Sequence, residues 1–199
     1  MDVEHEPTAN APTWLASVEE AIAAAREQRK IALVDFVKPG CIGCEAMEAT
    51  TFPDPTVEAE LREHFVCARL DITRDRAAAR QARILWTPSL NFWSRHQVLL
   101  RESIGYLPPR LMLLQLRFAR ALDALRRAEF DQSRTLFEQI AAATDAVELA
   151  PEAAYWVGIA GYLQDCDSAQ LRRAWRPLRA GWPDSTWAAR TDYEDWSKE

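Results

Sequence analysis

The feature that most constrains the fold is an apolar run at residues 31–37 that leads, through Lys38-Pro39-Gly40, into two cysteines three residues apart. A short and nearly continuous apolar run is typical of a strand buried on both faces. The proline and glycine end this strand, and a helix is expected to begin at Cys41 and to run towards Thr50. Cys41 and Cys44 are therefore predicted to lie on the first turn of a helix.

The start of a helix is a place where a thiol becomes reactive. The unpaired N–H groups there and the positive end of the helix dipole stabilise a thiolate. We expect Cys41 to be exposed and to attack substrates, and Cys44, about one turn further on, to resolve the mixed disulfide. Structural zinc sites use the same spacing, so the spacing alone leaves redox chemistry and metal binding open.

The segments around the cysteine pair alternate between helix and strand. A helix is expected over residues 14–29, before the strand at 31–37, and a second buried strand over 65–72. The order α-β-α-β-α-β-β-α, with parallel strands first and a closing hairpin, predicts an α/β sheet covered by helices. The remaining expected elements are helices at residues 57–63 and 75–82 and strands at 90–93 and 98–104.

From Pro109 onward only helices are predicted, and the charge changes as well. Residues 1–122 carry 15 basic and 16 acidic groups, whereas residues 123–199 carry 9 and 14. We place a domain boundary near residue 122 and interpret residues 1–13 as a disordered lead. The helices expected in the second part are residues 111–127, 130–143, 151–164, 168–180 and 185–193.

The overall composition restricts the class of protein. The 199 residues carry a net charge of −6, so no general attraction to nucleic acid or to an anionic membrane is expected. Residues 1–10 lack the basic and apolar regions of a secretory signal, and no run approaches about 18 consecutive apolar residues. These observations predict a cytoplasmic location. In such a reducing compartment a close cysteine pair indicates redox chemistry or metal binding.

The residues around the pair resemble the thioredoxin-like superfamily, in a soluble branch with C-x-x-C. Residues 33–36 resemble its central strand, and Asp35 precedes Cys41 by six residues, as the buried acid of the family does. Thr87-Pro88 matches its cis-proline site, and Gly105 its glycine after the hairpin. The resemblance covers about residues 14–122. It implies a thioredoxin-like fold, in which a mixed central sheet is flanked by helices.

The resemblance also implies roles for individual residues. Asp35 is implied as the proton acceptor for Cys44, through water; the alternative is a structural acid paired with Arg69. Pro88 is implied to be cis, which would place the Thr87 backbone beside the attacking cysteine to pair with an extended substrate. No bound cofactor is expected, because both electrons reside in the cysteine pair.

Trp86 is a further candidate that the residues themselves suggest. It precedes Pro88 by two residues, and Gly40 stands where the family usually has an aromatic residue. We predict that Trp86 covers the cysteine pair and forms part of a substrate groove together with Thr87 and Pro88. The alternative interpretation is an aromatic residue of the core or its rim.

Zinc is the main alternative ligand for the cysteines. His64 and Cys67 have the spacing of a second half-site, but residues 65–72 are predicted to be a strand, where positions three apart point to opposite faces. Both could ligate a metal only if His64 lies off the strand. We therefore expect no metal, with Cys67 as a small buried residue and Cys166 as a buried or half-exposed helix residue.

The helical tail resembles the tetratricopeptide pattern. Ala153 to Gly158, Tyr162, Leu171 and Trp175 combine small residues with large aromatic and apolar ones at helical spacing. The pattern gives about two imperfect repeats, fewer than the three or more that a free-standing solenoid needs. Residues 123–199 are thus interpreted as a tetratricopeptide-like domain. It either binds a protein partner or only stabilises the first domain.

Two functions follow from these patterns. The first is a thiol–disulfide oxidoreductase, most simply a protein-disulfide reductase. Its partners would be disulfide-bearing protein substrates and an external thiol or thioredoxin-reductase-type electron donor. The second is a redox-linked co-chaperone or holdase whose helical tail binds clients. Gly40 and Ile42-Gly43 depart from the usual residues of the family, so the direction of electron flow stays open.

Overall fold

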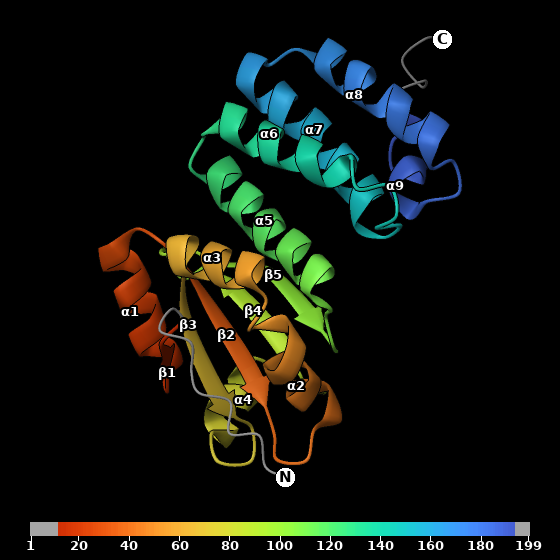
Figure 1. The fold of residues 1–199 in the computed structure, drawn as a ribbon. Coiled ribbons are helices and arrows are strands. Elements are labelled where there is room, and N and C mark those ends of the chain that lie inside the picture. Colours follow the sequence, from red (N-terminus) through yellow and green to blue (C-terminus); the bar gives the residue numbers. More distant parts are fainter. Residues whose placement is uncertain (1–11, 194–199) are drawn as a thin grey trace. The chain divides into compact units, whose positions relative to one another are not determined.

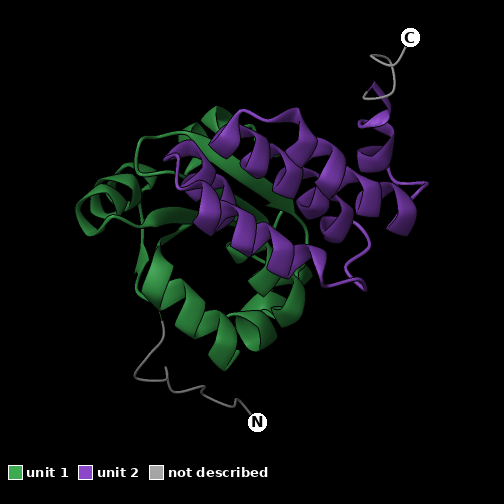
Figure 2. Cartoon of the chain, turned by 90° about the horizontal axis from the view of Figure 1, so that it is seen from above, with its two compact units in different colours: residues 1–119 green, residues 120–199 purple. Residues whose placement is uncertain are grey.

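The structure is a computed structural model that describes residues 12–193 (Figure 1). Its contacts divide the chain into two compact units, residues 1–119 and residues 120–199, which Figure 2 colours separately. The division falls inside helix α5 (Pro109–Arg126). Of the predicted disordered lead at residues 1–13, all but the last two residues lie outside the described part.

A five-stranded mixed sheet forms the centre of the first unit, with strand order β1-β3-β2-β4-β5. The central strand β2 (Ile31–Val37) runs parallel to β3 (Phe65–Asp71) and antiparallel to β4 (Ser89–Trp93). Strand β5 (Leu99–Ile104) pairs antiparallel with β4 at one edge, and β1 (Trp14–Leu15) pairs parallel with β3 at the other. The predicted fold class, a mixed sheet flanked by helices, is confirmed.

Alternate side chains of β2 enter two different layers of the core. Ile31 and Leu33 pack with residues of α3 (Pro55–His64) and of the first turns of α5. Ala32, Val34 and Phe36 pack on the opposite face with α1 (Val18–Gln28), where α4 (Arg76–Gln81) also lies. This alternation is the period-two pattern of a strand. It leaves Asp35 on the same face as Leu33.

The start of the first helix differs from the prediction. A helix was expected from Trp14, but Trp14–Leu15 is a short strand and α1 begins at Val18. Ser17 caps this helix, because its side chain accepts a hydrogen bond from the backbone N–H of Glu20. The cap stops the helix from extending backwards, and the residues before it pair with β3 instead.

The second unit is helical, as predicted, and includes the last turns of α5. Within it, Trp175 is fully buried, stacks on Tyr155 at 5.0 Å between ring centroids, and donates its indole N–H to the Tyr155 carbonyl. A side chain at Gly158 would come within 2.5 Å of the Trp175 ring nitrogen, so this close packing requires glycine. The remaining helices are α6 (Phe130–Ala141), α7 (Leu149–Asp165), α8 (Ser168–Gly181) and α9 (Thr186–Ala189).

Cys166 is exposed at the end of α7, in the left-handed backbone region, and is not the buried or half-exposed helix residue that was expected. Across residues 12–193, no helix combines the length and the apolar character needed to cross a bilayer. The tetratricopeptide-like interpretation of the tail remains a prediction.

Candidate functional site

The two cysteines at the start of α2 (Ile42–Ala46) form a disulfide. Gly40 has a φ of 68°, which favours glycine, and lets the chain turn sharply between β2 and the helix. Cys41 caps α2, because its sulfur accepts a hydrogen bond from the backbone N–H of Cys44 at 3.3 Å. A π-helical turn, η1 (Met47–Thr51), continues α2. The prediction that the pair lies on a helix start is confirmed.

The exposure expected for Cys41 is wrong for this oxidised pair, since the residue is only 6% exposed. The cause is the loop before β4, which packs against the sulfur. The hydroxyl of Thr87 donates a hydrogen bond to Cys41 Sγ at 3.4 Å. The Thr87–Pro88 peptide bond is cis, as the resemblance implied. The sequence pointed to the Thr87 backbone, whereas the structure adds its side chain to the site.

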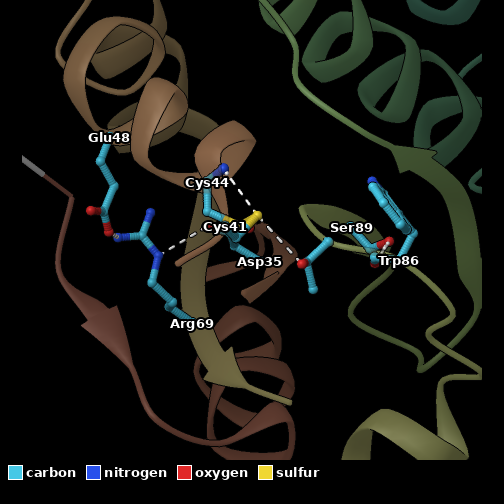
Figure 3. The surroundings of a disulfide bond; sticks show 8 residues. Asp35, Cys41, Cys44, Glu48, Arg69, Trp86 and Ser89 are labelled. Carbon is cyan, nitrogen blue, oxygen red and sulfur yellow. Dashed lines mark hydrogen bonds and ion pairs between the residues drawn. A yellow bond between two sulfur atoms is a disulfide. The ribbon is translucent and has the colours of Figure 1, made fainter. Parts of the chain in front are cut away.

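Asp35 lies on β2 close to the disulfide and is 1% exposed (Figure 3). Burial raises the pKa of its carboxyl to about 6, although the neighbouring Arg69 lowers it. Arg69 Nε donates to Asp35 Oδ2 at 2.9 Å, so the pairing foreseen in the structural interpretation is present. The raised pKa is also what a proton acceptor working near neutral pH requires. Geometry and charge therefore accommodate both interpretations of Asp35.

Glu48 is a member of the site that the sequence did not single out. It lies on η1, one helical turn after Cys44, and accepts a hydrogen bond from Arg69 Nη1 at 2.6 Å. Figure 3 shows Arg69 between the carboxylates of Glu48 and Asp35. The available signal was the arginine at position 69, since a guanidinium can bind two carboxylates at once.

The structure places Trp86 differently from the prediction. The residue is 65% exposed, and Figure 3 shows its side chain standing apart from the sulfur atoms. The Nζ atom of Lys38 lies over this ring, 6.0 Å from its centroid. In this structure Trp86 therefore does not cover the disulfide. Ile42 and Tyr106 are likewise exposed large residues.

Gly43 explains how closely α2 approaches the loop that carries the cis-proline. A Cβ atom at position 43 would lie 3.0 Å from Pro88 Cδ and 3.7 Å from Tyr106 Cβ. The Tyr106 hydroxyl in turn lies 3.3 Å from the hydroxyl of Thr50, on η1. The small residue between the two cysteines thus allows Pro88 and Tyr106 to pack directly on the helix start.

A separate cavity of about 460 Å³ opens on the side of Cys44. Cys44, Glu48 and Arg69 line it together with Trp14 from β1. Other charged side chains on its wall are those of Lys38, Glu45, Asp71 and Arg74. The two sulfur atoms therefore have different surroundings: the Thr87–Pro88 loop contacts Cys41, and a cavity with charged walls reaches Cys44.

The proposed zinc half-site is not assembled as the spacing suggested. His64 is the last residue of α3 and lies off β3, so the argument from opposite strand faces does not apply to it. Cys67 lies in the core and is 2% exposed, and burial raises the pKa of its thiol to about 12. Among the described residues, no three His, Cys, Asp or Glu side chains are placed to hold a metal ion.

Comparisons with known proteins agree with this arrangement. Residues 13–94 match a family model described as thioredoxin-like. Among curated proteins, the thiol:disulfide interchange protein DsbD of Vibrio vulnificus is 31% identical over 80 residues. The match covers 38% of this chain but 13% of the relative, so the chain spans a small part of that protein.

Solved structures show the same fold. A thioredoxin from Thermus thermophilus is 24% identical with a TM-score of 0.52, and the match covers 57% of this chain and 90% of that one. A proposed disulphide isomerase from Bacteroides thetaiotaomicron is 20% identical with a TM-score of 0.50, over 57% of this chain and 97% of that one. Both likenesses concern the fold of the first unit.

Proposed function

We propose that this chain, which carries a thioredoxin-like domain with a disulfide-forming cysteine pair, is a thiol–disulfide oxidoreductase that works as a protein-disulfide reductase. The observation that carries the proposal is the pair of hydrogen bonds to Cys41 Sγ, from the Cys44 backbone N–H and from the Thr87 hydroxyl. In the reduced protein the same two donors stabilise a thiolate on Cys41. A stabilised thiolate is the attacking group in disulfide exchange.

The reaction proceeds in two exchanges. The Cys41 thiolate attacks one sulfur of the substrate disulfide, forms a mixed disulfide, and releases the other substrate sulfur as a thiolate. Cys44 then loses its proton to Asp35, through water, and attacks Cys41 Sγ. The second substrate thiolate leaves, and the Cys41–Cys44 disulfide holds the oxidised state of the pair. Two electrons have passed from the cysteine pair to the substrate.

The partners follow from this chemistry. The substrates are proteins with an accessible disulfide, and an external thiol donor returns two electrons to the pair. Similarity to a thiol:disulfide interchange protein supports exchange with other thiol proteins. The cytoplasmic location expected from the sequence stays a prediction, which cell fractionation would test.

The test is to trap substrates with Cys44→Ser, which stops the second exchange. We expect discrete mixed disulfides that reducing agent releases. The matched control is the double variant Cys41→Ser/Cys44→Ser, which keeps the exposed Cys166 and should trap nothing. Adducts in the control, or none with Cys44→Ser, would contradict the proposal. If adducts are absent but Cys41→Ser protein suppresses client aggregation, the holdase alternative gains support.

A further inference from the structure

The side chain of Arg69 contacts groups from three segments, namely β1, β2, and η1 with the residue that follows it. Its guanidinium carbon lies 4.1 Å from the ring centroid of Trp14 and 5.0 Å from that of Phe52. These two rings also contact each other edge to face, with 5.0 Å between their centroids. In the plane of the guanidinium, Nε and Nη1 bind the carboxylates of Asp35 and Glu48. Aromatic rings therefore contact Arg69 while two carboxylates compete for its charge.

This competition determines how strongly Arg69 stabilises the ionised carboxylate of Asp35. Arg69 lowers the pKa of Asp35 by its charge and by its hydrogen bond, whereas the negative charge of Glu48 raises it. Within the described part of the chain, Asp35 Oδ1 and Arg69 Nη2 are buried without a hydrogen-bond partner. Asp35 thus depends on a single contact, to Arg69 Nε. A small displacement of the guanidinium would remove that contact.

We propose that Trp14 is a positioning residue, whose ring, together with that of Phe52, holds Arg69 against Asp35 and so sets the ionisation of the carboxyl group next to Cys44. The attraction between a guanidinium and an indole face is strongest when both are shielded from water. Trp14 is suited to this role because β1 pairs it with Cys67, two residues before Arg69 on β3. The short strand at the sheet edge thereby acts on the redox site through an arginine.

Other charged groups around Asp35 have weaker effects on it. Cys67, also on β3, stays a neutral thiol because its pKa is raised to about 12. Lys38, Glu45 and Arg74 line the cavity but are exposed, and water screens them. Asp71 forms an ion pair with Arg74. Arg69 and Glu48 are therefore the charges through which a change at Trp14 reaches Asp35.

The test follows the titration of Asp35 by carbon-13 NMR of its carboxyl group in the oxidised protein. Trp14→Leu keeps an apolar side chain but removes the aromatic face. In this variant we expect the midpoint to rise by about one pH unit, which is a tenfold decrease in the acid dissociation constant of Asp35. Trp14→Phe, which keeps a ring, should stay close to the wild type. Arg69→Met should shift the midpoint upward at least as far as Trp14→Leu.

The double variant Trp14→Leu/Arg69→Met separates positioning from a general structural effect. If Trp14 acts through Arg69, the double variant should titrate like Arg69→Met alone, because the two effects do not add. An unchanged midpoint in Trp14→Leu, an equal shift in Trp14→Phe, or additive shifts would each overturn the inference. If Trp14→Leu does not fold, an upward midpoint shift in Phe52→Leu, the second ring on Arg69, provides the same test, and no shift there would count against the inference.

The consequence for catalysis rests on the proposed function, but the titration does not. A protein in which Asp35 responds as described, yet which reduces no disulfide, would contradict the reductase proposal and leave the inference intact. If the reductase proposal also holds, the pH dependence of mixed-disulfide resolution should shift with the midpoint of Asp35.

Discussion

The two sulfur atoms of the disulfide have different surroundings. Cys41 accepts hydrogen bonds from an amide N–H and from a hydroxyl, and neither of these donors titrates near neutral pH. Cys44 adjoins a cavity whose wall includes the Arg69 guanidinium and the Glu48 carboxylate, with Asp35 buried behind Arg69. Fixed dipoles therefore contact Cys41, the proposed attacking thiol, whereas charged groups lie near Cys44, the proposed resolving thiol, and of these Asp35 titrates near neutral pH.

This difference suits the two exchanges. A thiolate that attacks substrates must be present continuously. Fixed hydrogen-bond donors stabilise such a thiolate without taking part in proton transfer. The resolving thiol must lose its proton only after the mixed disulfide has formed, and for this a nearby base with a pKa near the working pH is most effective. Changes on the side of Cys44 should therefore alter the pH dependence of the second exchange, and changes on the side of Cys41 should alter only the first attack.

The largest effect is expected in the pH dependence of stability. The folded protein holds the Asp35 proton more tightly than the unfolded chain, with a pKa of about 6 against 3.8. The free energy of unfolding should therefore fall as the pH rises from about 4 to about 6, by about 3 kcal/mol at pH 7. Urea unfolding of the oxidised protein at pH 4 and pH 7 measures this change.

Asp35→Asn is the control for this measurement, because other acids also titrate in the same range. The variant lacks the titrating carboxyl group of Asp35. Its free energy of unfolding should therefore decrease less between pH 4 and pH 7 than that of the wild type. An equal decrease in wild type and variant would mean that Asp35 is not protonated more readily in the folded protein.

A kinetic effect of similar size is expected for the same variant. Asp35→Asn removes the proposed base for Cys44, and general bases contribute about 100-fold or more. Resolution of a preformed mixed disulfide on Cys41 should slow about 100-fold at pH 7, while the first attack keeps its rate. Stopped-flow measurement of both steps separates them. A loss confined to the first attack would reverse the roles assigned to the two sides.

A smaller effect is expected on the side of Cys41. Thr87→Val removes the hydroxyl that donates to Cys41 Sγ but keeps the shape of the side chain. A hydrogen bond to a charged group contributes roughly 1.5 kcal/mol or more, so the pKa of the Cys41 thiol should rise by about one unit. The pH dependence of alkylation in a Cys44→Ser background measures it. Thr87→Ser, which keeps the hydroxyl, should resemble the wild type.

The side of Cys41 could largely be predicted from the sequence, whereas the side of Cys44 could not. The position of Cys41 and Cys44 on a helix start follows from local signals, namely an apolar run, a proline and a glycine within a few residues. Thr87–Pro88 was recognised from its resemblance to a known pattern. Each of these features is carried by a short stretch of chain, which is why sequence analysis found them.

The charged cluster on the side of Cys44 is different, because its members come from β1, β2, η1 and β3. Trp14 was expected in a helix, yet it forms a strand because β3 offers a pairing partner. Tertiary contacts of this kind override local propensity. Glu48 was not singled out for the same reason, since only the folded chain brings it within 2.6 Å of Arg69. Contacts between distant segments carry no local signal.

The smallest expected effect concerns Trp86, which belongs to the side of Cys41 but does not touch the sulfur. Because Trp86 is 65% exposed, Trp86→Ala should leave the pKa of the Cys41 thiol and the Asp35 midpoint unchanged. An exposed aromatic beside the exchange site can still contact an apolar substrate, and such contacts contribute about 1 kcal/mol. The KM for an apolar disulfide peptide should therefore rise about fivefold, with kcat unchanged.

Steady-state kinetics with an apolar and a charged peptide test whether Trp86 contacts the substrate, and the thiol pKa tests whether it covers the cysteine pair. A shift in the thiol pKa would show that Trp86 covers the pair in the reduced protein, and an unchanged KM for both peptides would remove Trp86 from the substrate surface.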